Sequence, residues 1–150
     1  MNKMEESKKG DKKKESKVIK EEDNPANKDT HAYMVMGTRF EIDRKYEIID
    51  PIGSGAYGVV VAAKDTSVAT PGPEGGESNL VAIKKIVKAF EHRVFALRTY
   101  RELKIQRLLE HENVLGVKMI LKPKNRESFN EIYVVSELME TDLAQIIKSN

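Results

Sequence analysis

Two runs of residues rich in β-branched side chains flank the glycine-rich stretch Gly53-Ser54-Gly55-Ala56-Tyr57-Gly58. Residues 46–50 precede this stretch and residues 59–63 follow it, which predicts two strands joined by a glycine-rich hairpin. Three glycines within six residues are more than a turn requires. Because glycine has no Cβ, such a loop lets backbone N–H groups approach phosphate oxygens closely. The hairpin is therefore a candidate phosphate-binding site.

The same glycine spacing also occurs in dinucleotide-binding folds. There the third glycine opens a helix, and an acidic residue about twenty positions later binds the ribose. Here a β-branched strand follows Gly58, and the acidic residues at that distance, Glu74 and Glu77, fall in a segment rich in Pro and Gly at residues 70–78. The context argues against a dinucleotide-binding fold. A plain hairpin, in which the glycines only permit the turn, is the other alternative.

A lysine lies within the next predicted strand, residues 80–86, in the sequence V-A-I-K. Strand alternation places Lys84 on the same face as Ala82, with Val81 and Ile83 on the opposite face. A half-buried ammonium group is costly unless it meets an anion. Lys84 is therefore a candidate ligand for an anion.

Helical spacing of apolar residues begins after this strand, at about residues 92–110. The expected apolar stripe contains Val94, Leu97, Ile105, Leu108 and Leu109. We expect this stripe to pack on the sheet, with Glu102 at its margin and able to reach Lys84. The alternative for Glu102 is an exposed pair with Arg98, worth only about 0.3–0.5 kcal/mol.

The rest of the chain predicts two more strands, at residues 115–121 and 131–138, and the start of a helix at residues 142–148. Residues 1–32 are highly charged and contain few apolar side chains, which predicts a disordered tail. The domain that follows is expected to span residues 33–150.

Composition excludes several classes of protein. Lys and Arg number 26 against 24 Asp and Glu, so the net charge of +2 does not favour a nucleic-acid partner. The chain contains no cysteine, which excludes disulfides and thiolate metal sites. Because its apolar runs are too short for a membrane span or a signal peptide, we expect no membrane partner and a location in the cytoplasm, the nucleus or both.

Together, the glycine-rich hairpin, the lysine of V-A-I-K and the helical glutamate resemble the protein kinases over residues 44–150. Around Glu102, at residues 111–115 and at residues 137–143, the sequence is most similar to mitogen-activated protein kinases, with cyclin-dependent kinases as the near alternative. The resemblance implies an α+β kinase amino-terminal lobe. Such a lobe has a five-stranded antiparallel sheet and one αC helix, followed by the hinge and the start of the next helix.

The resemblance also implies an ATP site in which Lys84 and Glu102 are the catalytic pair, with Lys84 on the α- and β-phosphates and Glu102 holding it. The implied ATP contacts are Ile52, Gly53, Ser54, Gly55, Ala56, Tyr57, Gly58, Val60, Ala82, Lys84, Glu137, Met139 and Asp142. Val60 and Ala82 would cover the adenine. The backbone of Glu137 and Met139 would meet its edge, and Asp142 would approach the ribose.

The family's catalytic loop, its D-F-G magnesium ligand and its T-x-Y activation lip would all lie beyond Asn150. We therefore expect no metal ligand within the chain, no phosphotransfer by residues 1–150 alone, and ATP with Mg²⁺ as the cofactors of the complete protein. The implied partners are protein substrates, phosphorylated on Ser or Thr, and an upstream activating kinase. The alternatives are a short non-catalytic module that competes for kinase partners and a nucleotide-binding protein that is not a kinase.

Overall fold

The structure, a computed structural model, describes residues 18–21, 28–55, 58–69, 78–123, 125–127 and 129–149. Within these residues five strands form one antiparallel sheet, in the order β4-β5-β6-β8-β7. Their bounds are β4 Tyr46–Gly55, β5 Gly58–Asp65, β6 Leu80–Ile86, β7 Val117–Ile120 and β8 Ile132–Glu137. The predicted α+β class and five antiparallel strands are confirmed.

A second sheet of three antiparallel strands begins in the part of the chain for which the sequence predicted disorder and continues into the predicted domain. It consists of β1 Val18–Lys20, β2 Thr30–Val35 and β3 Thr38–Asp43, in the order β1-β2-β3. The disorder prediction is therefore wrong for residues 18–20 and 30–32, because β2 and β3 pair along their whole length and β1 pairs with β2. The rest of the predicted tail lies outside the described residues except residues 21, 28 and 29. The division into a tail and a domain beginning at residue 33 stays a prediction.

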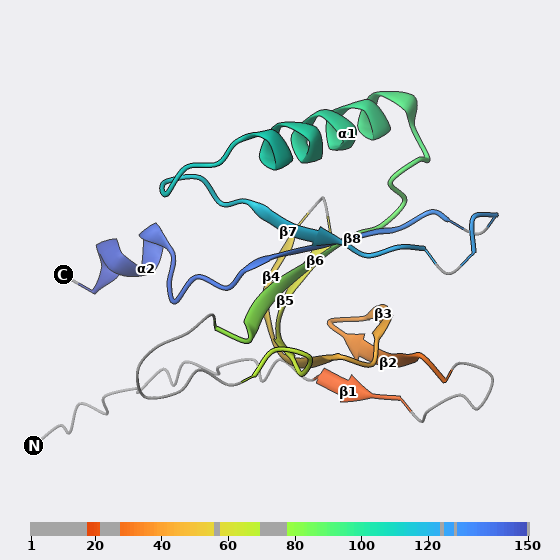
Figure 1. The fold of residues 1–150 in the computed structure, drawn as a ribbon, viewed down its shortest axis with the longest axis horizontal. Helices are drawn as coiled ribbons and strands as arrows, with labels where there is room; N and C mark the ends of the chain where they lie inside the picture. The colour runs from red at the N-terminus through yellow and green to blue at the C-terminus, as the bar shows by residue number, and fades with distance from the viewer. Residues whose placement is uncertain are drawn as a thin grey trace, which may run out of the picture.

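Apolar side chains join the two sheets. Figure 1 shows β1–β3 on one side of the five-stranded sheet and α1 on the other. The buried cluster between the sheets includes Tyr33, Val35, Phe40 and Ile42 from the three-stranded sheet and Val59, Val61, Val81 and Ile83 from the five-stranded sheet. A smaller cluster on the opposite side joins Leu103 to Ile86, Ile132 and Val134. Both faces of the central sheet are therefore covered, and β6 contributes side chains to both clusters.

Helix α1, Arg93–Leu108, packs on the sheet with a different face from the predicted one. Its buried residues are Thr99 and Leu103, and Phe95 packs beside them. The expected stripe of Val94, Leu97, Ile105, Leu108 and Leu109 is exposed, so this part of the prediction is wrong. A helix that meets a single sheet buries only one face, and the spacing of four residues in Phe95, Thr99 and Leu103 selects that face.

Helix α2, Leu143–Lys148, begins at the predicted position because Asp142 caps it. Its side-chain Oδ1 accepts a hydrogen bond from the backbone N–H of Gln145 at 2.8 Å. Such a bond satisfies one of the donors that the first turn of a helix leaves unpaired. The turn from the sheet into α2 is thereby fixed.

Candidate functional site

The glycine-rich hairpin is formed by the ends of β4 and β5, which pair as far as Gly55 opposite Gly58. Ser54 lies opposite Val59. A shift of register between Pro51 and Gly53 leaves Ile52 without a partner, and its side chain is exposed. Ala56 and Tyr57, which were also predicted ATP contacts, lie outside the described residues. The predicted hairpin followed by a strand is therefore present.

The glycines of the hairpin differ in their surroundings. Gly58 has φ +128, and a Cβ added there would lie 1.8 Å from the carbonyl oxygen of Lys85. A Cβ added at Gly53 or Gly55 would meet no atom within 4 Å. Gly58 is therefore required by the fold itself. At Gly53 and Gly55 the protein leaves open space, as a loop that approaches a phosphate chain must.

Lys84 and Glu102 form the ion pair that the sequence predicted. Lys84 Nζ lies 3.3 Å from Glu102 Oε1, and the two side chains are 34% and 45% exposed. The pair joins β6 to α1 and lines a cavity of about 320 Å³, together with Ile86, Phe95, Arg98 and Thr99. Because exposed pairs of this kind add about 0–1 kcal/mol to stability, the pair has little structural value. Its role in phosphate binding stays a prediction.

The two residues predicted to cover the adenine lie on the same sheet face as Lys84. Val60 is directly opposite Lys84 in the β5–β6 register, and Ala82 is opposite Ala62. Ala82 is buried and Val60 half-buried. Side chains two residues apart on a strand, and opposite each other across a ladder, share a face. The structure thus places an apolar surface next to the lysine.

The predicted hinge contacts lie at the end of β8 and on the segment that connects it to α2. Glu137 is the last residue of β8 and lies opposite Val81, and Met139 is largely exposed. Asp142, predicted to approach a ribose, uses Oδ1 to cap α2. The contacts of these three residues with a nucleotide stay predictions.

A larger cavity, of about 910 Å³, lies elsewhere. Its walls come from β3, from β7 and from the segment that leads into β8, and none of the predicted ATP contacts lines it. Cavity size alone would therefore point away from the site that the motifs identify.

Sequence reasoning passed over Lys85, the neighbour of Lys84. Its side chain is 4% exposed and lies between the two sheets, where it forms an ion pair with Glu131. A signal was present, because alternation places Lys85 on the same face as Val81 and Ile83, which the sequence predicted to be apolar. A lysine on such a face needs a partner.

Known proteins similar to this chain are named as mitogen-activated or extracellular signal-regulated kinases. Mitogen-activated protein kinase 7 of Arabidopsis thaliana is 51% identical over 120 residues, which are 80% of this chain and 30% of that protein. Mitogen-activated protein kinase 4 of Oryza sativa subsp. japonica is 49% identical over 124 residues, 83% of this chain and 31% of that protein. Extracellular signal-regulated kinase 1 of Dictyostelium discoideum is 48% identical over 121 residues, 81% of this chain and 21% of that protein.

The chain therefore spans less than a third of the length of these relatives. No protein-family model matches it. In the part of the chain that the structure describes, neither helix is long and apolar enough to cross a membrane. The same residues include no group of three or more His, Asp or Glu side chains placed to hold a metal ion.

Proposed function

This chain belongs to the mitogen-activated protein kinase family, and we propose that it forms the ATP-binding lobe of a serine/threonine protein kinase. It is homologous to the amino-terminal part of the family's members over four fifths of its own length. The observation that carries the proposal is the ion pair between Lys84 and Glu102 at 3.3 Å. This pair is half exposed and contributes little to stability, which supports a role in binding.

The phosphate chain of ATP would lie between the glycine-rich hairpin and Lys84. Open space at Gly53 and Gly55 admits phosphate oxygens to the backbone N–H groups of the hairpin. The Lys84 ammonium neutralises the α- and β-phosphates, and Glu102 holds that ammonium in place. The γ-phosphoryl group of bound ATP is what the reaction transfers to a protein hydroxyl.

The adenine would lie against the apolar face that carries Val60 and Ala82. Backbone groups of Glu137 and Met139, on the segment after β8, would bind its polar edge, and Asp142 would approach the ribose. The relatives are more than three times as long as the part that this chain matches, and we propose that the remaining part of such a kinase binds Mg²⁺ and orients the accepting hydroxyl. Protein substrates and an upstream activating kinase are proposed partners on the same basis.

A phosphotransfer assay tests this function in the product of the complete open reading frame that encodes the chain, called below the complete gene product. We expect Lys84→Met to lower kcat/KM for a generic basic protein substrate about 10²-fold or more, because the charge that holds the α- and β-phosphates in position is lost. The control is Lys88→Met, at a lysine beyond β6 whose side chain is 67% exposed. It should leave the rate within about twofold. Equal activity of the two variants would overturn the proposal.

A second candidate function is a non-catalytic module that competes for kinase partners. The observation that favours it is the exposed aliphatic stripe of α1, in which Val94 and Leu108 are each 73% exposed. Exposed apolar patches mark surfaces that bind another chain or domain. Inhibition of a related kinase by the complete gene product, in the absence of any phosphotransfer of its own, would favour this second function.

A further inference from the structure

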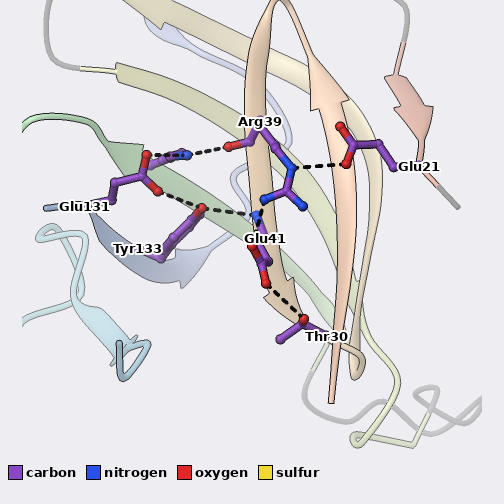
Figure 2. A network of polar contacts seen from close by, with 7 residues as sticks. Glu21, Thr30, Arg39, Glu41, Glu131 and Tyr133 are labelled. Carbon is purple, nitrogen blue, oxygen red and sulfur yellow. Dashed lines mark hydrogen bonds and ion pairs between the residues drawn. The ribbon is translucent and has the colours of Figure 1, made fainter. Parts of the chain in front are cut away.

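Lys85 is a buried cation held by groups from both sheets. Its Nζ donates a hydrogen bond to the backbone carbonyl of Arg39 in β3, and lies 2.8 Å from Oε1 of Glu131. Figure 2 labels Arg39 and Glu131, the two residues whose groups bind the Lys85 ammonium. The Lys85 side chain is 4% exposed, whereas that of Glu131 is 43% exposed. The ammonium thus enters the core from β6 and meets an anion at the edge of the sheet.

Two aromatic rings enclose the same ammonium. Nζ of Lys85 lies 5.3 Å from the ring centroid of Tyr133 in β8 and 5.8 Å from that of Phe40 in β3. The two rings meet edge to face, with centroids 5.9 Å apart. Each distance falls within the range of cation–π attraction. Lys85 therefore has a fixed position between the sheets.

Tyr133 extends this arrangement into the three-stranded sheet. Its hydroxyl accepts a hydrogen bond from the backbone N–H of Glu41 at 3.1 Å and donates one to Oε2 of Glu131 at 3.4 Å (Figure 2). Burial raises the pKa of this hydroxyl, so it keeps the proton that it donates. On the outer side Glu41 pairs with Arg39 at 2.7 Å, and Arg39 pairs with Glu21 at 3.0 Å. The network therefore runs without a break from β6 and β8 to the end of β1.

The main chain of Lys85 lies next to Gly58 of the glycine-rich hairpin, which is part of the candidate ATP site. Its carbonyl oxygen occupies the place where a Cβ of Gly58 would lie. Its neighbour Lys84 points to the opposite face of β6 and pairs with Glu102. A rotation of β6 about its axis would move both the end of the glycine-rich hairpin and the Lys84 ammonium. The Lys85 side chain, bound on the other face, opposes that rotation.

Stability alone does not explain a lysine at this position. The Lys85 ammonium loses its water on burial, and an ion pair of this kind offsets that loss without adding much to stability beyond what an apolar residue would add. A bound ammonium also fixes the rotation of β6 about its axis, because its hydrogen bonds form in only one orientation of the strand.

We propose that Lys85 is a positioning residue for ATP: it ties β6 to the three-stranded sheet and so sets the places of Lys84 and Gly58. The inference rests on the proposed ATP-binding function. The three-stranded sheet is thereby a part of the nucleotide site that acts at a distance, although none of its residues is among the proposed ATP contacts.

The test is steady-state kinetics of the complete gene product with Lys85→Met, which keeps the length of the side chain and removes its charge. We expect KM for ATP to rise about tenfold, because a small displacement of a binding group has effects of that order or larger. KM for the protein substrate should stay within error of that of the unchanged protein, although the lost contacts of the buried ammonium lower the melting temperature. The control is Lys64→Met, at an exposed lysine of the neighbouring strand β5.

A second variant, Tyr133→Phe, keeps the ring beside Lys85 and breaks the hydrogen bonds to Glu41 and Glu131. It should also raise KM for ATP and leave KM for the protein substrate unchanged. This second variant decides the question if Lys85→Met does not fold. An unchanged KM for ATP in folded variants overturns the inference and leaves the proposed function intact. A rise in KM for both ATP and the protein substrate, with a fall in melting temperature, also overturns the inference. That pattern indicates a general loss of stability and not a displaced ATP site. Failure of the unsubstituted protein to bind ATP overturns the proposed function and this inference together.

Discussion

Gly53 and Gly58 lie in the same hairpin but face different neighbours. At Gly58 the positive φ of +128 and the carbonyl of Lys85, 1.8 Å from the place of a Cβ, leave no room for a side chain. At Gly53 there is no atom within 4 Å of that place. The need for glycine at residue 58 therefore comes from the protein, and at residue 53 it would come from the ligand.

Alanine substitution separates these two reasons. Gly58→Ala should lower the free energy of unfolding by about 1–3 kcal/mol or more. This is the range for a residue forced into a disfavoured backbone region. Gly53→Ala should change the free energy of unfolding by no more than about 1 kcal/mol, yet should weaken ATP binding about tenfold. In the complete gene product, urea denaturation of the two variants measures the free energy of unfolding, and ATP titration measures the affinity for ATP. Unweakened ATP binding in Gly53→Ala would contradict the phosphate-binding role of the hairpin.

Individual residues were predictable from the sequence where a motif and a strand period agreed. Lys84 was assigned to the strand face that carries Ala82 and Glu102 to the helix packed beside it, and the structure joins the two side chains at 3.3 Å. Lys85 was missed because its partners, Arg39 and Glu131, are 46 residues away on either side along the chain. Strand alternation indicates that Lys85 needs a partner, but no local pattern in the sequence identifies partners at that distance.

At the scale of elements, helix α1 shows what apolar periodicity does not decide. The helix has an aliphatic face around Leu108 and a mixed face of Phe95, Thr99 and Leu103, and the sheet covers only the second. Periodicity counts apolar side chains but does not say which face a neighbouring element reaches first. The boundaries of the helix were predictable to within two residues, whereas its orientation required the structure.

Two leucines of α1 test this orientation. Leu103, 9% exposed, packs against Ile86, Ile132 and Val134, whereas Leu108 is 73% exposed. Leu103→Ala should lower the free energy of unfolding by about 2–4 kcal/mol through the lost contacts and the cavity left behind. Leu108→Ala should change it by less than about 0.5 kcal/mol. Chemical denaturation of the two variants provides the comparison, and a larger effect at Leu108 would mean that the predicted stripe is the buried one after all.

At the scale of the whole described chain, the five-stranded sheet was predictable and the three-stranded sheet was not. Each strand of the larger sheet carries a run of β-branched residues, or a motif, that indicates it locally. Strand β1 is only three residues long, and β2 begins with the polar residues Thr30 and His31. Their stability comes from pairing and from the core shared with the larger sheet. Such contacts are invisible to any local pattern.

The central claim, that Lys84 lies beside the phosphates of bound ATP, is tested most directly by affinity labelling. An acyl phosphate derivative of ATP transfers its acyl group to a lysine amine close to the phosphate chain, and peptide mass spectrometry identifies the lysine. In the complete gene product we predict acylation of Lys84, suppressed by excess ATP, with neither Lys85 nor Lys88 labelled in this way. Labelling that spares Lys84, or that excess ATP does not suppress, would contradict the account.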